Sequence, residues 1–209
     1  MSIKSAKQLA RRSVAYPGPG AQWVIPQRLL EQTFQYLCRY GTCRSEGLAY
    51  WAGSIGASGE NVVQVLLLIN HRPQGPRVEV TGQEVRLVLR ALRRLDLKLL
   101  AQVHSHPGEA FHSYGDDEHA TSFHPGFLSV VVPDLGQTQP TLESCALYEY
   151  HEEFRRLSQQ EVRERLQILP EAVELQPSPW GQAILKKHRS KAIWSTLKRI
   201  LKQTAHKGA

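Results

Sequence analysis

The sequence predicts an α/β or α+β domain in which helices flank a mixed sheet that leans towards antiparallel pairing. Strand-length apolar runs recur through residues 46–150 and are separated by turns rich in Gly, Ser and Pro. Helix-length segments with capping residues and an apolar stripe lie before, between and after these runs. A length of 209 residues suits one ordinary domain with extensions. Mixtures of this kind form layers of helices on a sheet.

The first half of the domain contributes two helices and a pair of strands. A proline at the first turn opens the helix predicted at residues 26–41. Two strands are predicted at Glu46–Ile55 and Asn61–Asn70, with a Gly/Ser turn between them. The next helix is predicted at Thr81–Leu95, because its threonine and the glutamate three residues later form a capping pattern.

The second half alternates strands with polar loops and ends in a helix. Its apolar runs and capping pattern predict, in order, a strand at Leu97–Val103, a short helix at Asp116–Ser122, strands at Gly126–Pro133 and Leu142–Tyr150, and a helix from Ser158 that ends before Pro170.

Charge and chain-breaking residues divide the sequence into three parts. The net charge is +7, yet residues 1–30 hold five Lys or Arg and residues 180–209 hold eight, both without acids, which leaves −6 in the middle. We therefore expect a basic N-terminal arm at residues 1–25, a domain at 26–175 and a basic amphipathic helix at 176–209.

The predicted C-terminal helix has two interpretations. Apolar residues recur at helical spacing among Lys and Arg, so the helix could dock on the domain by its apolar stripe. Its basic face could instead contact an acidic protein, nucleic acid or an anionic membrane surface. The stripe consists of Ile193, Trp194, Leu197, Ile200 and Leu201.

Composition excludes several classes of protein. An apolar fraction of 41% and a charged fraction of 22% are those of a globular chain. No apolar run reaches the roughly 18 residues of a membrane span, and the N-terminus lacks the apolar core of a secretory signal. The number and spacing of the three cysteines fit neither a disulfide framework nor a four-cysteine zinc site nor a deaminase site; they are Cys38, Cys43 and Cys145. Because free cysteines are typical of reducing compartments, we expect the protein in the cytoplasm.

Two histidines at the end of a predicted strand are the strongest candidates for metal ligands. His104 and His106 are separated by one residue, so on a strand their side chains point to the same face. Asp116 follows after a loop long enough to fold back. Two imidazoles and a carboxylate leave a fourth tetrahedral position for water, which is the layout of a catalytic zinc site.

The full pattern resembles the JAMM (MPN+) family of zinc metalloproteases. The family signature is an upstream Glu, then H-[ST]-H-P, a loop and S-x-x-D. Here it is matched by Glu46, by His104-Ser-His106-Pro and by Ser113-Tyr-Gly-Asp116. The similarity covers about 125 residues, 26–150, and is greatest to bacterial members associated with ubiquitin-like conjugation operons. It implies an MPN/JAB-type mixed sheet flanked by helices.

The resemblance also implies the role of each residue. His104, His106 and Asp116 would hold one Zn²⁺, Glu46 would act as general base, and Ser113 would donate a hydrogen bond to the oxyanion. The implied activity is an isopeptidase or peptidase that cleaves after the C-terminus of a ubiquitin-like protein, either to deconjugate it or to mature its precursor. Proteins of the conjugation pathway are the implied partners; the basic ends alone do not indicate a nucleic-acid substrate.

Alternatives remain for one ligand and for the function. The loop before the serine is one residue shorter than in many family members, so Asp117 is the fallback ligand if total spacing is kept. The remaining loop histidines, at positions 112, 119 and 124, are expected to be solvated more often than to support a site. A catalytically silent MPN scaffold is the rival function, although such modules typically lose ligands that this chain retains.

Overall fold

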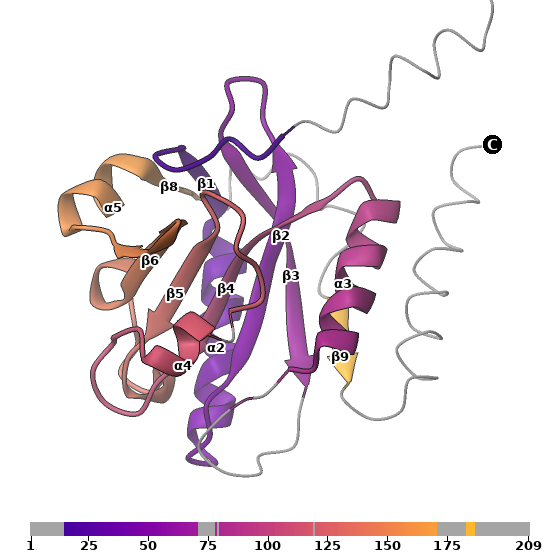
Figure 1. Ribbon diagram of the computed structural model, residues 1–209. Coiled ribbons are helices and arrows are strands. Elements are labelled where there is room, and N and C mark those ends of the chain that lie inside the picture. The colour runs from indigo at the N-terminus through magenta and orange to yellow at the C-terminus, as the bar shows by residue number, and fades with distance from the viewer. Residues whose placement is uncertain (1–14, 71–77, 79, 119, 171–182, 187–209) are drawn as a thin grey trace, which may run out of the picture.

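A single mixed sheet organises the molecule. The computed structural model describes residues 15–70, 78, 80–118, 120–170 and 183–186 (Figure 1). The strand order is β7-β6-β5-β4-β2-β3-β1-β8, with β9 beside β3. The strands are β1 (Trp23–Pro26), β2 (Leu48–Ile55), β3 (Asn61–Asn70), β4 (Lys98–Ser105), β5 (Leu128–Val132), β6 (Ala146–His151), β7 (Glu153–Arg156), β8 (Leu166–Leu169) and β9 (Ala183–Lys186).

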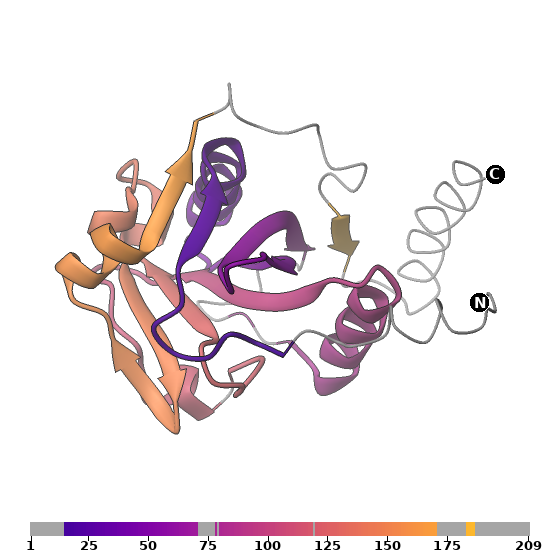
Figure 2. The same cartoon turned by 90° about the horizontal axis from the view of Figure 1, so that it is seen from above.

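Helices cover both faces of this sheet, which confirms the predicted α+β class. Figures 1 and 2 show α2 on one face and α3 on the other. The helices are α2 (Gln27–Gly41), α3 (Gly82–Arg94), α4 (Tyr114–Glu118) and α5 (Gln159–Arg165), with 3-10 turns η1 (Asp134–Gly136) and η2 (Leu142–Ser144).

Two apolar layers hold the helices to the sheet. On the α2 face, Leu37 and Trp51 are both fully buried, and the Trp51 indole donates to Thr33 of α2 at 3.0 Å. On the opposite face, Val88 and Leu92 of α3 pack in the same cluster as Leu48 and Tyr50. Each such side chain contributes about 1.5–3 kcal/mol by leaving water. Alternate residues of β2 therefore belong to different layers, as expected of a central strand.

The capping boxes predicted for two helices are present. Thr81 accepts a hydrogen bond from the Glu84 amide, while the Glu84 carboxylate accepts one from the Thr81 amide at 2.8 Å. Ser158 and Glu161 make the same reciprocal pair before α5. Each box satisfies amides that the first turn of a helix leaves without carbonyl partners.

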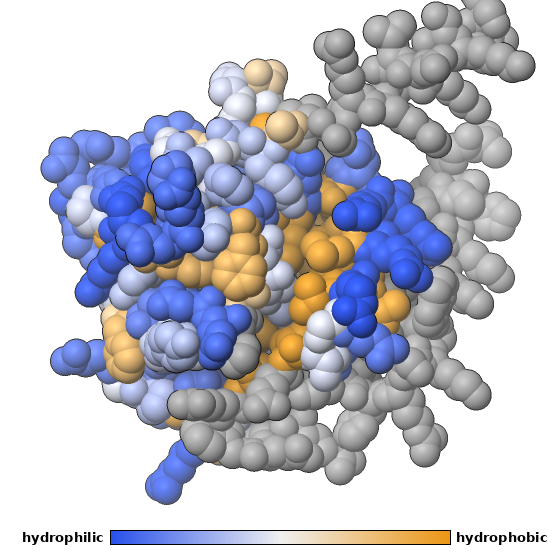
Figure 3. Space-filling model, viewed as in Figure 1, coloured by the Kyte–Doolittle hydropathy of each residue, from blue (hydrophilic) through white to orange (hydrophobic). Residues whose placement is uncertain are grey.

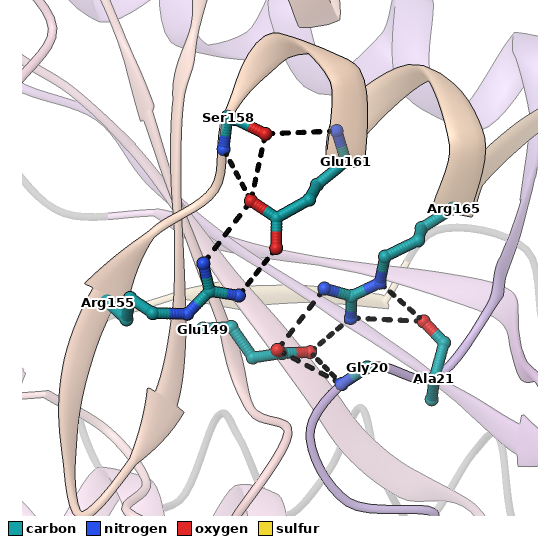
Figure 4. Close-up of polar contacts among 7 residues, drawn as sticks. All are labelled: Gly20, Ala21, Glu149, Arg155, Ser158, Glu161 and Arg165. Carbon is teal, nitrogen blue, oxygen red and sulfur yellow. Dashed lines mark hydrogen bonds and ion pairs between the residues drawn. The ribbon is translucent and has the colours of Figure 1, made fainter.

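The N-terminal arm ends earlier than predicted. Residues 1–14 of the predicted arm (1–25) lie outside the described part, but Trp23 and Ile25 are fully buried in β1. Their apolar side chains join the α2-face core, and so the chain enters the domain at β1 rather than after it. The preceding turn is also docked: the Gly20 amide donates to Glu149, and the Ala21 carbonyl accepts from Arg165 (Figure 4).

Part of the predicted C-terminal helix is a strand instead. Within 176–209 the structure describes Ala183–Lys186, which form β9 parallel to the last residues of β3. The edge of β3 offers unpaired backbone groups where β1 no longer covers it, and β9 pairs with them. The amphipathic stripe at 193–201 lies outside the described residues, so both of its interpretations stay predictions.

Two further strands were absent from the sequence prediction. β7 and β8 have only four residues each, and charged or polar residues dominate β7. Their pairing comes from tertiary position: β7 pairs with β6, and β8 lies parallel to β1. The sequence predicts that the preceding helix continues through residues 166–169, whereas the helix ends at Arg165.

Candidate metal centre

The two histidines of the H-x-H motif lie at the end of the central strand β4: His104 is in the strand and His106 directly follows it. β4 pairs with β2 on one side and with β5 on the other, so His104 is held in the interior of the sheet. Its side chain lies on the α3 face, because it is directly opposite Leu48 of that layer. His106 continues the pairing beyond β4: its amide donates to Val132 at 2.9 Å, and its carbonyl accepts from Leu135 at 2.8 Å.

Asp116 folds back between the two imidazoles. Its carboxylate oxygens lie 3.3 Å from His104 Nε2 and 3.2 Å from His106 Nε2. One donor atom from each of the three residues falls within 4.8 Å of the others, and they form a group able to hold a metal ion in the described part of the chain. The two rings meet edge to face, with centroids 4.9 Å apart.

The polar atoms of this group are better placed to bind a metal ion than to form hydrogen bonds with one another. His104 Nε2 is buried and makes no hydrogen bond, despite lying 3.3 Å from an oxygen of Asp116. Buried polar atoms are rarely left without a partner, and such an atom aimed at a second imidazole and a carboxylate is what a bound cation would satisfy. Two imidazoles and one carboxylate form a zinc-type donor set that leaves a position open.

Ser113 orients the carboxylate of this group. Both its amide and its hydroxyl donate to Asp116 Oδ2 at 2.7 Å, at the start of α4. Burial raises the pKa of Asp116, but contacts with His104, His106 and Ser113 outweigh it and hold the pKa well below its usual range. The carboxylate is therefore ionised, the form in which it binds a metal.

Glu46 lies two residues before β2, on the chain segment that runs beside the end of β4. Leu48 pairs with His104, and one step further the Ser105 amide donates to the Gly47 carbonyl at 3.1 Å. Continued by one more residue, this antiparallel register would set Glu46 opposite His106. Glu46 is half-buried. Gly47 permits this course, because a Cβ there would come within 2.9 Å of a methyl group of Leu37 on α2.

The two adjacent aspartates of α4 point to different partners. Asp116 faces the histidine pair, whereas Asp117 Oδ1 lies 2.7 Å from Nδ1 of His112. The other ring nitrogen of His112 is 2.9 Å from the Ser129 hydroxyl. The side chain of His112 is only 3% exposed, so the expectation of a solvated loop histidine is wrong for this residue.

Aromatic contacts explain why His112 is buried. Its ring stacks on Tyr148 at a centroid distance of 4.7 Å and lies equally close to Phe154. Burial lowers the pKa of His112, while the hydrogen bond to Asp117 opposes that shift. His124 is half-buried too and stacks on Tyr16, so it is not simply solvated either. His119 lies outside the described residues.

A row of polar side chains crosses the strands β2, β4, β5 and β6, two residues before His104 on β4. Register pairs Tyr50 with Gln102, Gln102 with Ser129, and Ser129 with Tyr148. Gln102 donates to Ser129 at 3.0 Å and accepts from the Thr121 amide at 3.0 Å. Sequence reasoning missed this row, although Gln102 and Ser129 are polar residues inside otherwise apolar strands, the signal that could have revealed it.

The loop that carries Asp116 also carries exposed aromatic side chains. In the described part of the chain, the large hydrophobic residues that remain exposed are Phe111 at 50%, Tyr114 at 79% and Phe123 at 48%. All three belong to the loop that carries Asp116, and the Phe111 ring packs against His106 with a centroid distance of 5.3 Å. Figure 3 shows further apolar surface on this face, beside α3.

Other predicted features have plain structural outcomes. Cys38, Cys43 and Cys145 are all free thiols, and Cys145 is buried as expected. Among the described residues, no helix has the length and hydropathy to cross a membrane.

Comparisons with known proteins place the chain in a family. No family model matches it. A solved protein from Desulfitobacterium hafniense superposes with a TM-score of 0.53 over 71% of this chain and 94% of its own, at 15% identity, which supports the fold alone. The "Probable metalloprotease y4jG" of Sinorhizobium fredii is 32% identical over 128 residues, covering 59% of this chain and 78% of the relative. At that identity and coverage, the chain belongs to the same family as this metalloprotease.

Proposed function

We propose that the protein is a zinc-dependent peptidase of the JAMM type that cleaves after the C-terminus of a ubiquitin-like modifier. The observation that carries the proposal is the convergence of His104, His106 and Asp116 around an unpaired, buried imidazole nitrogen. Kinship with a protein named a probable metalloprotease supports peptidase chemistry. The choice of modifier rests on the sequence resemblance, in which all five signature residues are retained.

In this proposal the two histidines and Asp116 hold one Zn²⁺. When bound, zinc would lower the pKa of a coordinated water and polarise the scissile carbonyl. Glu46, half-buried and two residues before β2, takes the role of general base: it accepts the proton of the attacking water and returns it to the leaving amine.

Ser113 has two successive tasks in this scheme. Its hydroxyl donates to Asp116, so it orients that ligand before substrate binds. Donation to the oxyanion, the role implied by the resemblance, requires the hydroxyl to turn from Asp116 towards the substrate. The aromatic side chains at positions 111, 114 and 123 offer apolar contacts for a substrate beside the site.

A cleavage assay with matched glutamate variants tests the proposal. The substrates are ubiquitin-like proteins fused at their C-termini to a reporter, with a generic peptide as comparison. Glu46→Gln should reduce kcat/KM at least about 100-fold while zinc binding is retained, because only the proton acceptor is lost. Glu60 is the control: it is also half-buried and directly precedes a strand, so Glu60→Gln should cleave normally.

Three results would separate the alternatives. Wild-type protein that binds no zinc and cleaves nothing is the silent scaffold. Cleavage of the generic peptide without any modifier fusion would keep the peptidase and remove the modifier. Equal activity of Glu46→Gln and wild type would remove the mechanism.

A further inference from the structure

We propose that the hydrogen bond between His112 and Asp117 positions α4 so that Asp116, rather than its neighbour, faces the metal. His112 has no role in the signature by which the site was recognised, and its side chain lies buried at 3% exposure. The inference rests on the proposed metal site and goes beyond it, because it names a second contact, besides that of Ser113, that orients the third ligand.

The Asp117 carboxylate sets the direction of the hydrogen bonds made by the His112 ring. A carboxylate accepts, so the hydrogen between the two side chains lies on His112 Nδ1, which donates to Asp117. In the neutral ring Nε2 is then the acceptor, and it receives the hydroxyl hydrogen of Ser129, whose oxygen accepts in turn from Gln102. The strands thus present a donor of fixed direction to α4.

The ring of His112 cannot easily move to follow α4. It is stacked on Tyr148, and its own backbone amide donates to the Tyr148 hydroxyl at 3.1 Å. The other end of the loop is tied to the same row, since Thr121 donates from its amide to Gln102 and from its hydroxyl to Tyr50. The short helix lies between these two anchors.

Because of helical geometry, the bond that holds Asp117 also sets the direction of the Asp116 side chain. Successive side chains on a helix point about 100° apart, so when Asp117 is held by His112, Asp116 turns towards a different partner. That partner is the histidine pair, 3.2 and 3.3 Å away. Asp117 is otherwise free to point to solvent, with its side chain 52% exposed, so no other burial constraint sets its direction.

Zinc affinity, measured by competition with a chromophoric chelator, tests the bond without relying on cleavage. His112→Phe keeps an aromatic ring against Tyr148 and Phe154 but removes both nitrogens; Asp117→Ala removes the acceptor. Each should weaken zinc binding at least about 10-fold, as loss of an outer-shell hydrogen bond does elsewhere. The double variant should bind no more weakly than either single one, because both remove the same bond.

Two controls separate this role from general packing. Asp117→Asn retains an oxygen that accepts from Nδ1, so its zinc affinity should stay within about 3-fold of wild type. Thr42→Val removes a threonine hydroxyl hydrogen bond at the end of α2, outside this loop, and should change affinity equally little. Wild-type melting temperature in His112→Phe, with its weaker zinc binding, would show that the loss is not one of folding.

The outcomes distinguish this inference from the proposed function. If wild-type protein does not bind zinc, both fail. If wild type binds and His112→Phe or Asp117→Ala binds equally well, the metal site stands and the positioning role is overturned. Additive losses in the double variant, or an Asp117→Asn as weak as Asp117→Ala, would overturn it as well.

Discussion

Two buried charged groups in this molecule are arranged in opposite ways. The carboxylate of Glu149, 2% exposed, accepts from the Arg165 guanidinium and from the Gly20 amide, and the remaining donors of Arg165 reach the Ala21 carbonyl (Figure 4). In the group of His104, His106 and Asp116 the two histidines are buried and the aspartate is partly exposed, and His104 Nε2 has no hydrogen-bond partner.

The difference separates a structural role from a functional one. The ion pair joins β6, α5 and the N-terminal turn, and its partners are all supplied by the chain. The histidine group needs something that the described chain does not supply. A buried polar atom is costly to leave without a hydrogen bond, so a group kept in that condition is a candidate for ligand binding.

Breaking the buried ion pair of Glu149 and Arg165 should have the largest effect on stability. Glu149→Ala leaves the Arg165 guanidinium buried without its counter-ion, which costs about 3–5 kcal/mol in similar cases. Urea unfolding measures the loss. Replacing both residues, Glu149→Leu with Arg165→Met, should recover much of it, because neither charge then remains buried. A single variant that loses less than about 1 kcal/mol would contradict the comparison.

Removing the buried nitrogen of His104 should have a much smaller effect in the absence of metal. Metal-free His104→Leu should stay within about 1 kcal/mol of wild type, because the loss of an unsatisfied buried atom offsets the loss of the contact with Asp116. Zinc at about 100 times its dissociation constant should stabilise wild type by about 2.7 kcal/mol and this variant not at all. Calorimetric melting with and without zinc checks both, and strong destabilisation of the metal-free variant would show that the histidine is structural.

A half-buried histidine outside both groups, His124, sharpens the comparison through pH. Burial and the nearby charge of Lys98 lower the pKa of His124 to about 4. Its unfolded pKa is about 6.5, so only the unfolded state gains this proton as the pH falls from 6.5 towards 4, and stability decreases over that window. Because the ring is partly exposed, we expect a loss of about 1 kcal/mol between pH 6.5 and 5.

Substitution isolates this contribution. His124→Gln should remove that part of the pH dependence, whereas the same change at the exposed His151 should leave it in place. Urea unfolding at pH 6.5, 5.8 and 5 gives the slopes. Equal slopes in wild type and His124→Gln would exclude a lowered pKa at this residue.

The smallest effect is expected at an exposed ion pair beside the buried one. Arg155 contacts Glu161 at 2.7 Å, with side-chain exposures of 54% and 30% (Figure 4). Solvent screens such pairs, so Arg155→Ala should change stability by no more than about 0.5 kcal/mol, and salt should reduce even that. A loss comparable to that of Glu149→Ala would show that exposure is not what separates the two pairs.

Local patterns in the sequence predicted most of the elements that place the site. The capping boxes at Thr81 and Ser158 act within one helical turn, and alternation along β4 puts His104 and His106 on one face. Both are short-range effects that periodicity captures. β7 and β8 were missed because strands of four residues depend on their neighbours for pairing.

The candidate site was predictable as a set of residues but not as a geometry. The motif identified two histidines and an aspartate as metal ligands and left Asp117 as the alternative to Asp116. In the structure Asp116 lies beside the two histidines, whereas Asp117 contacts His112. That choice depends on His112 and on strand partners 17 to 36 residues further along the chain. Contacts at such separation are set by tertiary packing, which local sequence does not encode.

The position of β4 between two paired neighbours limits how the protein could be retargeted. β2 and β5 are themselves paired on both sides, so neither is a free edge of the sheet in the described part of the chain. The loop that carries Asp116 holds the exposed aromatic residues 111, 114 and 123, and we expect these side chains to influence selectivity for a substrate. Exposed positions tolerate substitution at small cost in stability. Directed evolution of new substrates can therefore concentrate on this loop and leave the sheet unchanged.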